Sequence, residues 1–399
     1  MDMQKREPGS RGRIVTSFAT RPIDLAEHLA GLTLHSPREM DRKLEQLGYR
    51  GQPEARRAVC LMAYRHLRRL CHIHVDGVPP DELPPKSNLL MMGPTGCGKT
   101  YLVELLFREV LGLPTVIVDA TTLSETGYVG QDCASVLARL LHAARGHRNL
   151  AQVGVVCLDE FDKLAGGQSN AVFAGAGTTK DVTGRGVQRE LLRMLEASRV
   201  TVPLEGMPVP RGGQVLLDTR DIAFVASGAF SGFCRAAHSG QKEERIGFGR
   251  RVSSREPERI DYRLEASEAQ DVTAFQRFGF MPELIGRFSR IVPFQPLERE
   301  TLAAIVRDNV LPRAVNEFAL EGYELEIDPS CLDHLVDCAL ERQTGARGLT
   351  SELDLALEAV AYERFPAPEE GGRVVLSMHG GEVQVEIEEP SAGLAVCTG

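Results

Sequence analysis

The chain has 399 residues, of which 43% are hydrophobic and 25% are charged, and its formal net charge at pH 7 is −9. This length favours two or three domains, and the composition is that of an ordinary soluble protein. The acidic balance argues against a nucleic-acid partner, because a phosphate backbone requires a basic face. A membrane partner is not expected either, since no apolar run approaches the length of a membrane span.

Two features of the sequence predict a cytoplasmic location. Residues 1–15 are polar and basic and contain no apolar core of a signal peptide. The nine cysteines include no Cys-x-x-Cys pair, which is typical of free thiols in a reducing compartment. The same absence argues against a structural zinc site, so zinc is not expected as a cofactor.

The first part of the chain predicts an arm followed by helices. Residues 1–36 show no strong periodicity and form the expected N-terminal arm. Residues 37–70 have apolar side chains at helical spacing, interrupted near residues 48–51. A proline-rich surface loop at 77–85 then leads to an apolar run at 88–92, which predicts a buried strand.

Strands and helices alternate beyond this point. Apolar runs predict three further strands, at 115–118, 153–158 and 222–226. Helical spacing predicts helices between them, at 133–144 and 187–195. Continuous apolar strands separated by helices are typical of a parallel sheet covered on both faces. We therefore predict an α/β fold for the large domain, residues 37–295.

The sequence changes character near residue 296. Helical patterns predominate, and two short strand-like runs follow them at 373–377 and 382–387. This predicts a smaller α-rich domain over residues 296–388 and a disordered tail at 389–399. The expected helices cover residues 299–318, 329–342 and 349–364.

The turn after the first predicted strand follows the phosphate-binding pattern G-x-x-x-x-G-K-[ST]. Glycines in such a loop let backbone N–H groups point at phosphates, at the positive end of the following helix. Lys99 would then reach the outer phosphates of a nucleoside triphosphate, and the Thr100 hydroxyl would bind Mg²⁺. The predicted nucleotide site comprises Gly93, Pro94, Thr95, Gly96, Cys97, Gly98, Lys99 and Thr100.

Two carboxylates, Asp159 and Glu160, directly follow the predicted strand at 153–158. Because ligands of parallel sheets bind at the carboxyl ends of the strands, both side chains should lie close to the phosphate loop. Asp159 would hold hydrated Mg²⁺. Glu160 would act as the general base that activates the attacking water.

Two arginines are candidates for stabilising the phosphoryl group during hydrolysis. Arg287 follows a short apolar helical turn, and Arg347 opens a helix of the smaller domain. A guanidinium group suits the charge that develops on a transferred phosphoryl group. Spacing alone leaves another interpretation open, in which each arginine forms a surface ion pair.

With these motifs in place, the chain resembles the AAA+ protein unfoldases of the ClpX family over residues 36–388. The run Asp-Glu-Phe-Asp-Lys at 159–163 matches the acidic strand end of that family. The resemblance implies an AAA+ P-loop large domain with a small domain, ATP and Mg²⁺ as cofactors, and a homo-hexamer. It implies that Arg287 is a finger reaching a neighbouring subunit's nucleotide and that Arg347 senses nucleotide state. The residues that match the substrate-gripping pore loop are Gly127, Tyr128, Val129 and Gly130.

A further match concerns the peptidase partner of this family. Ile246, Gly247 and Phe248 resemble the loop tripeptide with which ClpX unfoldases dock on the ClpP peptidase. The resemblance therefore implies a ClpP-like peptidase and protein substrates as partners. If the family resemblance is set aside, the tripeptide is interpreted as part of an ordinary polar loop with one exposed aromatic residue.

The chain departs from the ClpX pattern in several places, and three of them concern its ligands and substrates. Residues 1–36 contain no counterpart of the family's zinc-binding domain, so zinc and the usual adaptors are not implied. Residues 206–210 are uncharged where the family has a basic loop at the pore entrance, so its recognition of degradation tags is not carried over. Tyr49 and Arg50 replace the aliphatic pair that packs on adenine in the family, which predicts a different affinity for ATP or a different hydrolysis rate.

Together these features predict an ATP-dependent protein unfoldase and translocase that feeds substrates to a ClpP-like peptidase. Three other functions remain open. One is a remodelling chaperone that works without a peptidase, and another is a regulatory ClpX paralogue mixed into rings. The third is a DNA-acting motor. The intact Glu160 and both arginines argue against a loss of hydrolysis, and the acidic balance argues against DNA as the partner.

Overall fold

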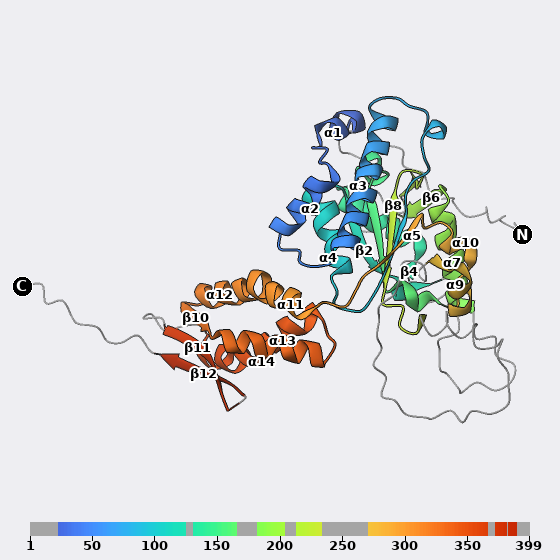
Figure 1. Ribbon diagram of the computed structural model, residues 1–399. Coiled ribbons are helices and arrows are strands. Elements are labelled where there is room, and N and C mark those ends of the chain that lie inside the picture. Colours follow the sequence, from blue (N-terminus) through green and yellow to red (C-terminus); the bar gives the residue numbers. More distant parts are fainter. Residues whose placement is uncertain are drawn as a thin grey trace, which may run out of the picture. The chain divides into compact units, whose positions relative to one another are not determined.

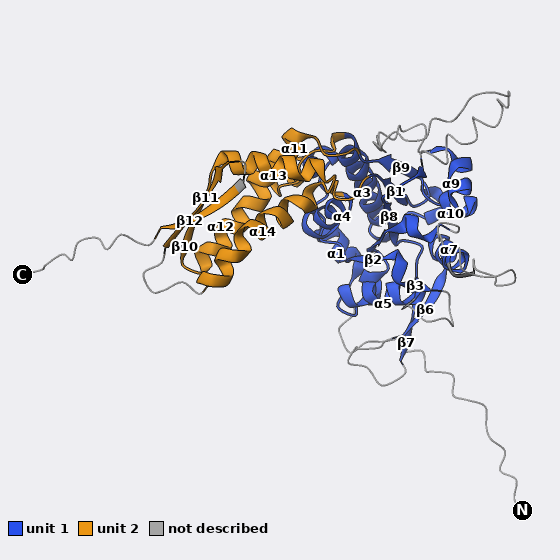
Figure 2. Ribbon diagram, turned by 90° about the horizontal axis from the view of Figure 1, so that it is seen from below, with its two compact units in different colours: residues 1–41, 54–93, 99–294 blue, residues 42–53, 94–98, 295–399 orange. Residues whose placement is uncertain are grey.

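The structure is a computed structural model that describes residues 23–124, 131–165, 182–203, 213–233, 270–365, 372–380 and 382–388. The chain forms two compact units, which Figure 2 shows in different colours. Unit 1 comprises Met1–Asp41, Glu54–Gly93 and Lys99–Phe294, and unit 2 comprises Arg42–Pro53, Pro94–Gly98 and Gln295–Gly399. The domain bounds expected from the sequence stay a prediction.

Unit 1 is built around a parallel sheet with the strand order β2–β5–β8–β1–β9 (Figure 1). Its central strands β8 and β1 are completely buried, as expected of parallel strands with helices on both faces. The predicted α/β fold with a parallel sheet is confirmed. The strands are β1 (Leu89–Met92), β2 (Thr115–Asp119), β5 (Val155–Asp159), β8 (Ala223–Gly228) and β9 (Arg290–Pro293).

Helices lie on both sides of this sheet. Figure 1 shows α3 (Pro53–His74) and α4 (Lys99–Val103) on one side and α5 (Cys133–Ala143) and α7 (Val182–Leu195) on the other. Local chemistry sets the start of α5, because the Asp132 carboxylate accepts a hydrogen bond from the Ala134 N–H at 3.1 Å. The apolar face of α5 then reaches the core through residues at helical spacing, Val136, Leu137, Leu140 and Leu141.

Shorter elements complete unit 1. Its further helical segments are α1 (Leu25–Gly31), η1 (Pro80–Glu82), η2 (Glu104–Val110), η3 (Ala120–Thr122), α6 (Arg148–Ala151), η4 (Phe161–Leu164), α9 (Val272–Phe278) and α10 (Pro282–Ile285). Helix α2 (Pro37–Gln46) includes residues of both units. The remaining strands form two small pairs, the parallel β3 (Leu123–Ser124) with β4 (Gln131–Asp132) and the antiparallel β6 (Arg199–Pro203) with β7 (Gln214–Asp218).

Helix α1 and strand β9 are among the elements of unit 1 that were not predicted from the sequence. Helix α1 lies within the expected arm, where the Asp24 carboxylate caps it by accepting a hydrogen bond from the Ala26 N–H at 2.9 Å. Strand β9 extends the sheet beyond β1, with Leu89 opposite Arg290. Both segments are short, and β9 is only partly buried, so neither carries a long apolar pattern.

An aromatic contact connects the acidic end of β5 with the segment around α10. Phe161, two positions after Asp159, stacks on Phe280 with ring centroids 5.1 Å apart. It also meets Phe288 edge-on at 5.5 Å. Because Phe280 and Phe288 flank α10, this packing holds the segment that carries Arg287 against the segment that follows the acidic strand end.

Unit 2 combines helices with a second sheet. The helical elements are α11 (Arg299–Ile305), η6 (Val306–Val310), α12 (Leu311–Leu320), α13 (Pro329–Glu341) and α14 (Ala346–Arg364). The sheet has the order β10 (Tyr323–Ile327), β11 (Gly372–His379), β12 (Glu382–Glu388). Strand β10 was not predicted from the sequence, because its apolar residues alternate with glutamates over five positions only.

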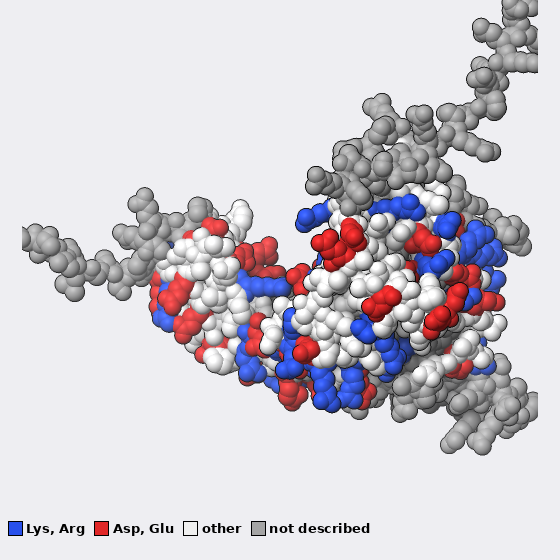
Figure 3. Space-filling model, turned by 90° about the horizontal axis from the view of Figure 1, so that it is seen from above, with Lys and Arg blue, Asp and Glu red and all other residues white. Residues whose placement is uncertain are grey.

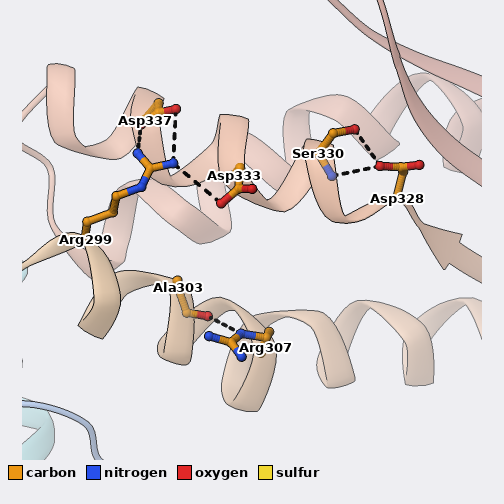
Figure 4. A network of polar contacts seen from close by, with 7 residues as sticks. All are labelled: Arg299, Ala303, Arg307, Asp328, Ser330, Asp333 and Asp337. Carbon is orange, nitrogen blue, oxygen red and sulfur yellow. Dashed lines mark hydrogen bonds and ion pairs between the residues drawn. The ribbon is translucent and has the colours of Figure 1, made fainter.

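Charged side chains join the helices of unit 2 (Figure 4). Arg299, at the start of α11, pairs with Asp337 and lies 3.5 Å from Asp333, both on α13. Asp328 caps α13 by accepting a hydrogen bond from the Ser330 N–H at 2.8 Å. These contacts fix α11 against α13 above the apolar core of the unit.

The described surface mixes charges of both signs. On the face drawn in Figure 3, Lys and Arg side chains are interspersed with Asp and Glu side chains. Within the described ranges, no helix combines the length and the apolar character that crossing a membrane requires.

Candidate nucleotide site

The phosphate loop leads from β1 into α4. Its backbone requires glycine, since φ is +76° at Gly96 and +91° at Gly98. Space is short as well, because a Cβ atom at Gly96 would lie 2.3 Å from the Thr344 carbonyl oxygen. Lys99 is 8% exposed, and its ammonium group donates a hydrogen bond to the Gly93 carbonyl at 2.7 Å. The loop therefore has the tight backbone and the enclosed cation that phosphate binding needs.

The remaining loop residues differ in exposure. Thr95 is exposed and Pro94 is half-buried, whereas the Cys97 side chain is 2% exposed. Thr100 follows Lys99 in the first turn of α4. The predicted residues 93–100 thus form one continuous turn between a buried strand and a helix.

Strand β5 brings the first acidic residue to this turn. The Thr100 hydroxyl donates a hydrogen bond to Asp159 Oδ2 at 2.8 Å, although the two residues lie on different elements. A hydroxyl and a carboxylate at this separation are oxygen ligands of the kind that Mg²⁺ prefers. The residues present therefore fit Mg²⁺ with a nucleotide. Thr100 and Asp159 are the residues that would hold the ion.

Glu160 directly follows Asp159 and has an exposed side chain. Its backbone is left-handed, with φ +52° and ψ +32°, a conformation that costs a non-glycine residue roughly 1 kcal/mol. The Glu160 N–H donates a hydrogen bond to Asp159 Oδ1 at 3.0 Å. The two carboxylates therefore have different surroundings. The Asp159 carboxylate accepts hydrogen bonds, whereas Glu160 is exposed to solvent.

Ser227 completes the surroundings of Asp159 and was not among the predicted site residues. Its side chain is fully buried near the end of β8, and its hydroxyl donates a hydrogen bond to Asp159 Oδ1 at 2.8 Å. Burial and the nearby charge of Asp159 also raise the pKa of the Cys157 thiol to about 12, so this neighbour stays neutral at pH 7. A signal for Ser227 exists in the sequence, namely a hydroxyl that directly follows an apolar run.

Replacing Ser227 by alanine is expected to raise the Mg²⁺ concentration for half-maximal ATP hydrolysis about threefold to tenfold, because Asp159 loses a charge-assisted donor. Titration of phosphate release against Mg²⁺ measures this shift. Thr115→Val is the matched control, since Thr115 is 2% exposed and its hydroxyl donates to the Leu113 carbonyl at 2.9 Å. An equal shift in both variants would contradict a specific role for Ser227.

Arg287 lies just after α10, with its side chain 48% exposed. It forms an ion pair with Glu196, which follows α7, and the Asn88 side-chain amide donates a hydrogen bond to the Arg287 carbonyl at 3.1 Å. The sequence had left open that Arg287 forms a surface ion pair, and the structure contains such a pair. An exposed pair of this kind contributes about 0–1 kcal/mol to stability, so it leaves the guanidinium available for another partner.

Arg347 lies in the first turn of α14 with an exposed side chain. The residues before it contact the phosphate loop within unit 2, since the Ala346 N–H donates a hydrogen bond to the Gly96 carbonyl at 3.0 Å. A Cβ atom at Gly345 would lie 2.7 Å from the same oxygen. The helix that carries Arg347 therefore begins directly against the loop.

Two predicted sites lie outside the described residues. They are the pore loop, Gly127, Tyr128, Val129 and Gly130, and the docking tripeptide, Ile246, Gly247 and Phe248. The uncharged stretch at 206–210 lies outside them as well.

A parallel sheet with a phosphate loop after β1 and a carboxylate at the end of β5 defines a P-loop ATPase. Comparison with known families refines this class. The family described as AAA domain (Cdc48 subfamily) matches residues 84–291. The family described as the C-terminal, D2-small domain of ClpB protein matches residues 297–368.

Comparison with individual proteins gives the family. An ATP-dependent Clp protease ATP-binding subunit ClpX 3 from Methylococcus capsulatus is 37% identical over 340 residues, which cover 82% of this chain and 76% of that protein. The ClpX subunit of Azotobacter vinelandii is 37% identical over 345 residues, covering 84% and 76%. That of Bacteroides fragilis is 32% identical over 373 residues, covering 89% and 86%. The chain belongs to the ClpX family of AAA+ ATPases, as the resemblance implied.

Proposed function

We propose that this chain is an ATP-dependent protein unfoldase and translocase that delivers substrates to a ClpP-like peptidase. The observation that carries the proposal is the similarity, over 82% of the chain or more, to proteins named ATP-binding subunits of the Clp protease. The contact between Thr100 and Asp159 supports it, because an unfoldase needs an intact hydrolytic site.

The proposed chemistry divides hydrolysis among the residues of the site. Lys99 and the loop N–H groups bind the phosphates of ATP. Mg²⁺, when bound, neutralises charge on the phosphate oxygens. Glu160 accepts a proton from the water that attacks the terminal phosphorus, and the bond to the bridging oxygen breaks to release ADP.

The proposed assembly is a homo-hexamer of two-domain subunits. Residues 37–295 would form the large ATPase domain, residues 296–388 the small domain, and residues 389–399 a tail. Arg287 would act on the nucleotide of a neighbouring subunit, which requires an oligomer. Arg347 would couple the nucleotide state to the small domain.

In this proposal the pore loop performs the mechanical work on the protein substrate. Tyr128 on a glycine-flanked turn presents a flat amphipathic ring to any polypeptide, which suits a motor with diverse protein substrates. Ile246, Gly247 and Phe248 would dock on the peptidase. The proposal places the protein in the cytoplasm and includes neither a nucleic-acid partner nor a membrane partner, and zinc is not among its proposed cofactors.

Replacing Phe248 by alanine is expected to abolish ATP-dependent degradation while leaving ATP hydrolysis unchanged, because the variant loses the apolar anchor of the docking loop and no group of the nucleotide site. The assay uses purified chain and ClpP from the same source, with one unstructured and one folded substrate. Neither substrate carries a degradation tag of the family type.

Other outcomes identify two of the other functions. ATP hydrolysis without degradation by the wild-type chain would reject the coupled function and favour a remodelling chaperone that works without a peptidase. Failure of the purified chain to hydrolyse ATP would instead favour a regulatory paralogue that acts in mixed rings.

A further inference from the structure

Tyr49 packs on the phosphate loop. It lies in the short connection between α2 and α3, and its side chain is only 2% exposed. Its hydroxyl donates a hydrogen bond to the Gly98 carbonyl at 3.3 Å. Both residues belong to unit 2, whose ranges include Arg42–Pro53 and Pro94–Gly98.

The ring is in direct contact with the loop backbone. A Cβ atom at Gly98 would lie 3.0 Å from the Tyr49 hydroxyl oxygen and 3.3 Å from ring atom Cε2. Gly98 also has φ +91°, so both the backbone and the tyrosine ring require glycine at this position. The aromatic side chain thus occupies the space that a larger loop residue would need.

The hydrogen bond acts on one particular peptide group. The Gly98 carbonyl and the Lys99 N–H belong to the same planar trans peptide, so they point in opposite directions. A donor that holds the carbonyl therefore aims the Lys99 N–H away from the tyrosine. In a phosphate loop, the backbone N–H groups that point in this direction donate hydrogen bonds to phosphate.

The backbone around Tyr49 is itself held in place. The Tyr49 N–H donates a hydrogen bond to the Leu44 carbonyl at 2.9 Å. Arg50 Nε lies 2.7 Å from Asp308 Oδ2, and Arg50 also donates to the Glu45 carbonyl. The tyrosine ring is therefore preorganised by residues on both sides of it.

We propose that Tyr49 is a positioning residue of the nucleotide site, whose hydroxyl orients the Gly98–Lys99 peptide toward the phosphates. The inference rests on the proposed nucleotide site and assigns to Tyr49 a role at the phosphates. Its effect is independent of the base, in contrast to a residue that packs on adenine.

The test compares Tyr49→Phe with Tyr323→Phe. Tyr323 is 4% exposed, its hydroxyl donates to the Arg364 carbonyl at 3.3 Å, and its ring packs on Gly372. The two variants therefore lose the same kind of hydrogen bond. Calorimetry would measure the Kd of MgADP and of MgIDP, which differ only in the base.

Tyr49→Phe is expected to raise both Kd values by the same factor, about threefold to tenfold, because one hydrogen bond is lost. Tyr323→Phe is expected to leave both Kd values at those of the wild type. Without nucleotide, amide hydrogen exchange at residues 94–99 is expected to be faster in Tyr49→Phe than in Tyr323→Phe.

Three results would overturn the inference. Unchanged Kd values and unchanged exchange in Tyr49→Phe would show that the hydroxyl does not orient the loop. Weaker binding of MgADP alone would show that Tyr49 acts on the base. Absence of nucleotide binding by the wild-type chain would reject the nucleotide site itself and, with it, the inference.

Discussion

Replacement of Arg287 by alanine is expected to lower the ATP hydrolysis rate of the assembled chain by about 10³-fold to 10⁵-fold, the range found for arginine fingers. Binding of ADP should stay at the wild-type level, because the guanidinium acts on charge that develops during phosphoryl transfer. Steady-state phosphate release and calorimetry measure the two quantities. An equal loss of rate and of ADP binding would contradict this role.

Two controls separate a finger from a surface ion pair. Glu196→Ala removes the ion pair and keeps the guanidinium, so hydrolysis should persist in that variant. Mixing Arg287→Ala chains with Glu160→Gln chains should restore part of the activity, because some sites then combine an intact Glu160 with a neighbour's Arg287. Loss of hydrolysis in Glu196→Ala, or mixtures without activity, would argue against action across a subunit interface.

Replacement of Glu160 by glutamine is expected to lower the hydrolysis rate by about 10²-fold to 10⁴-fold, since the amide cannot accept a proton from water. The affinity for ATP should stay within about twofold, because the phosphates are bound by the loop and by Lys99. The thermal stability should also be unchanged, because glutamine would adopt the same left-handed backbone conformation, with φ +52°, as glutamate does.

Glu283→Gln provides the matched control for this variant. Glu283 is an exposed residue of α10, so the same change of charge should leave the hydrolysis rate unchanged. Equal activities of the wild type and of Glu160→Gln would reject Glu160 as the base.

Much of the site follows from local patterns. The phosphate loop was recognisable because Gly96 and Gly98 must adopt positive φ and Lys99 must follow them, and all of this is local in sequence. The strand that ends in Asp159 was recognisable because a buried parallel strand is a continuous apolar run. The contact between Thr100 and Asp159 agrees with the expectation that ligands gather at one edge of the sheet.

Other parts could not be derived from such patterns. Ser227 donates to Asp159 because β8 lies beside β5, and an apolar run does not encode which strand is its neighbour. Strand β9 is too short and too exposed to carry a pattern of its own. Tyr49 departs from the family pattern, and its contact with Gly98 connects segments that lie far apart in the chain.

The sequence by itself determined the class of this protein, the residues of its phosphate loop and the acidic pair at the end of β5. Each of these depends on conformational rules that act over a few neighbouring residues. Only the tertiary structure decided which donors surround Asp159 and which side chain supports Gly98. The reason is that a hydrogen bond between distant segments depends on strand order and packing, which local residue patterns leave undetermined.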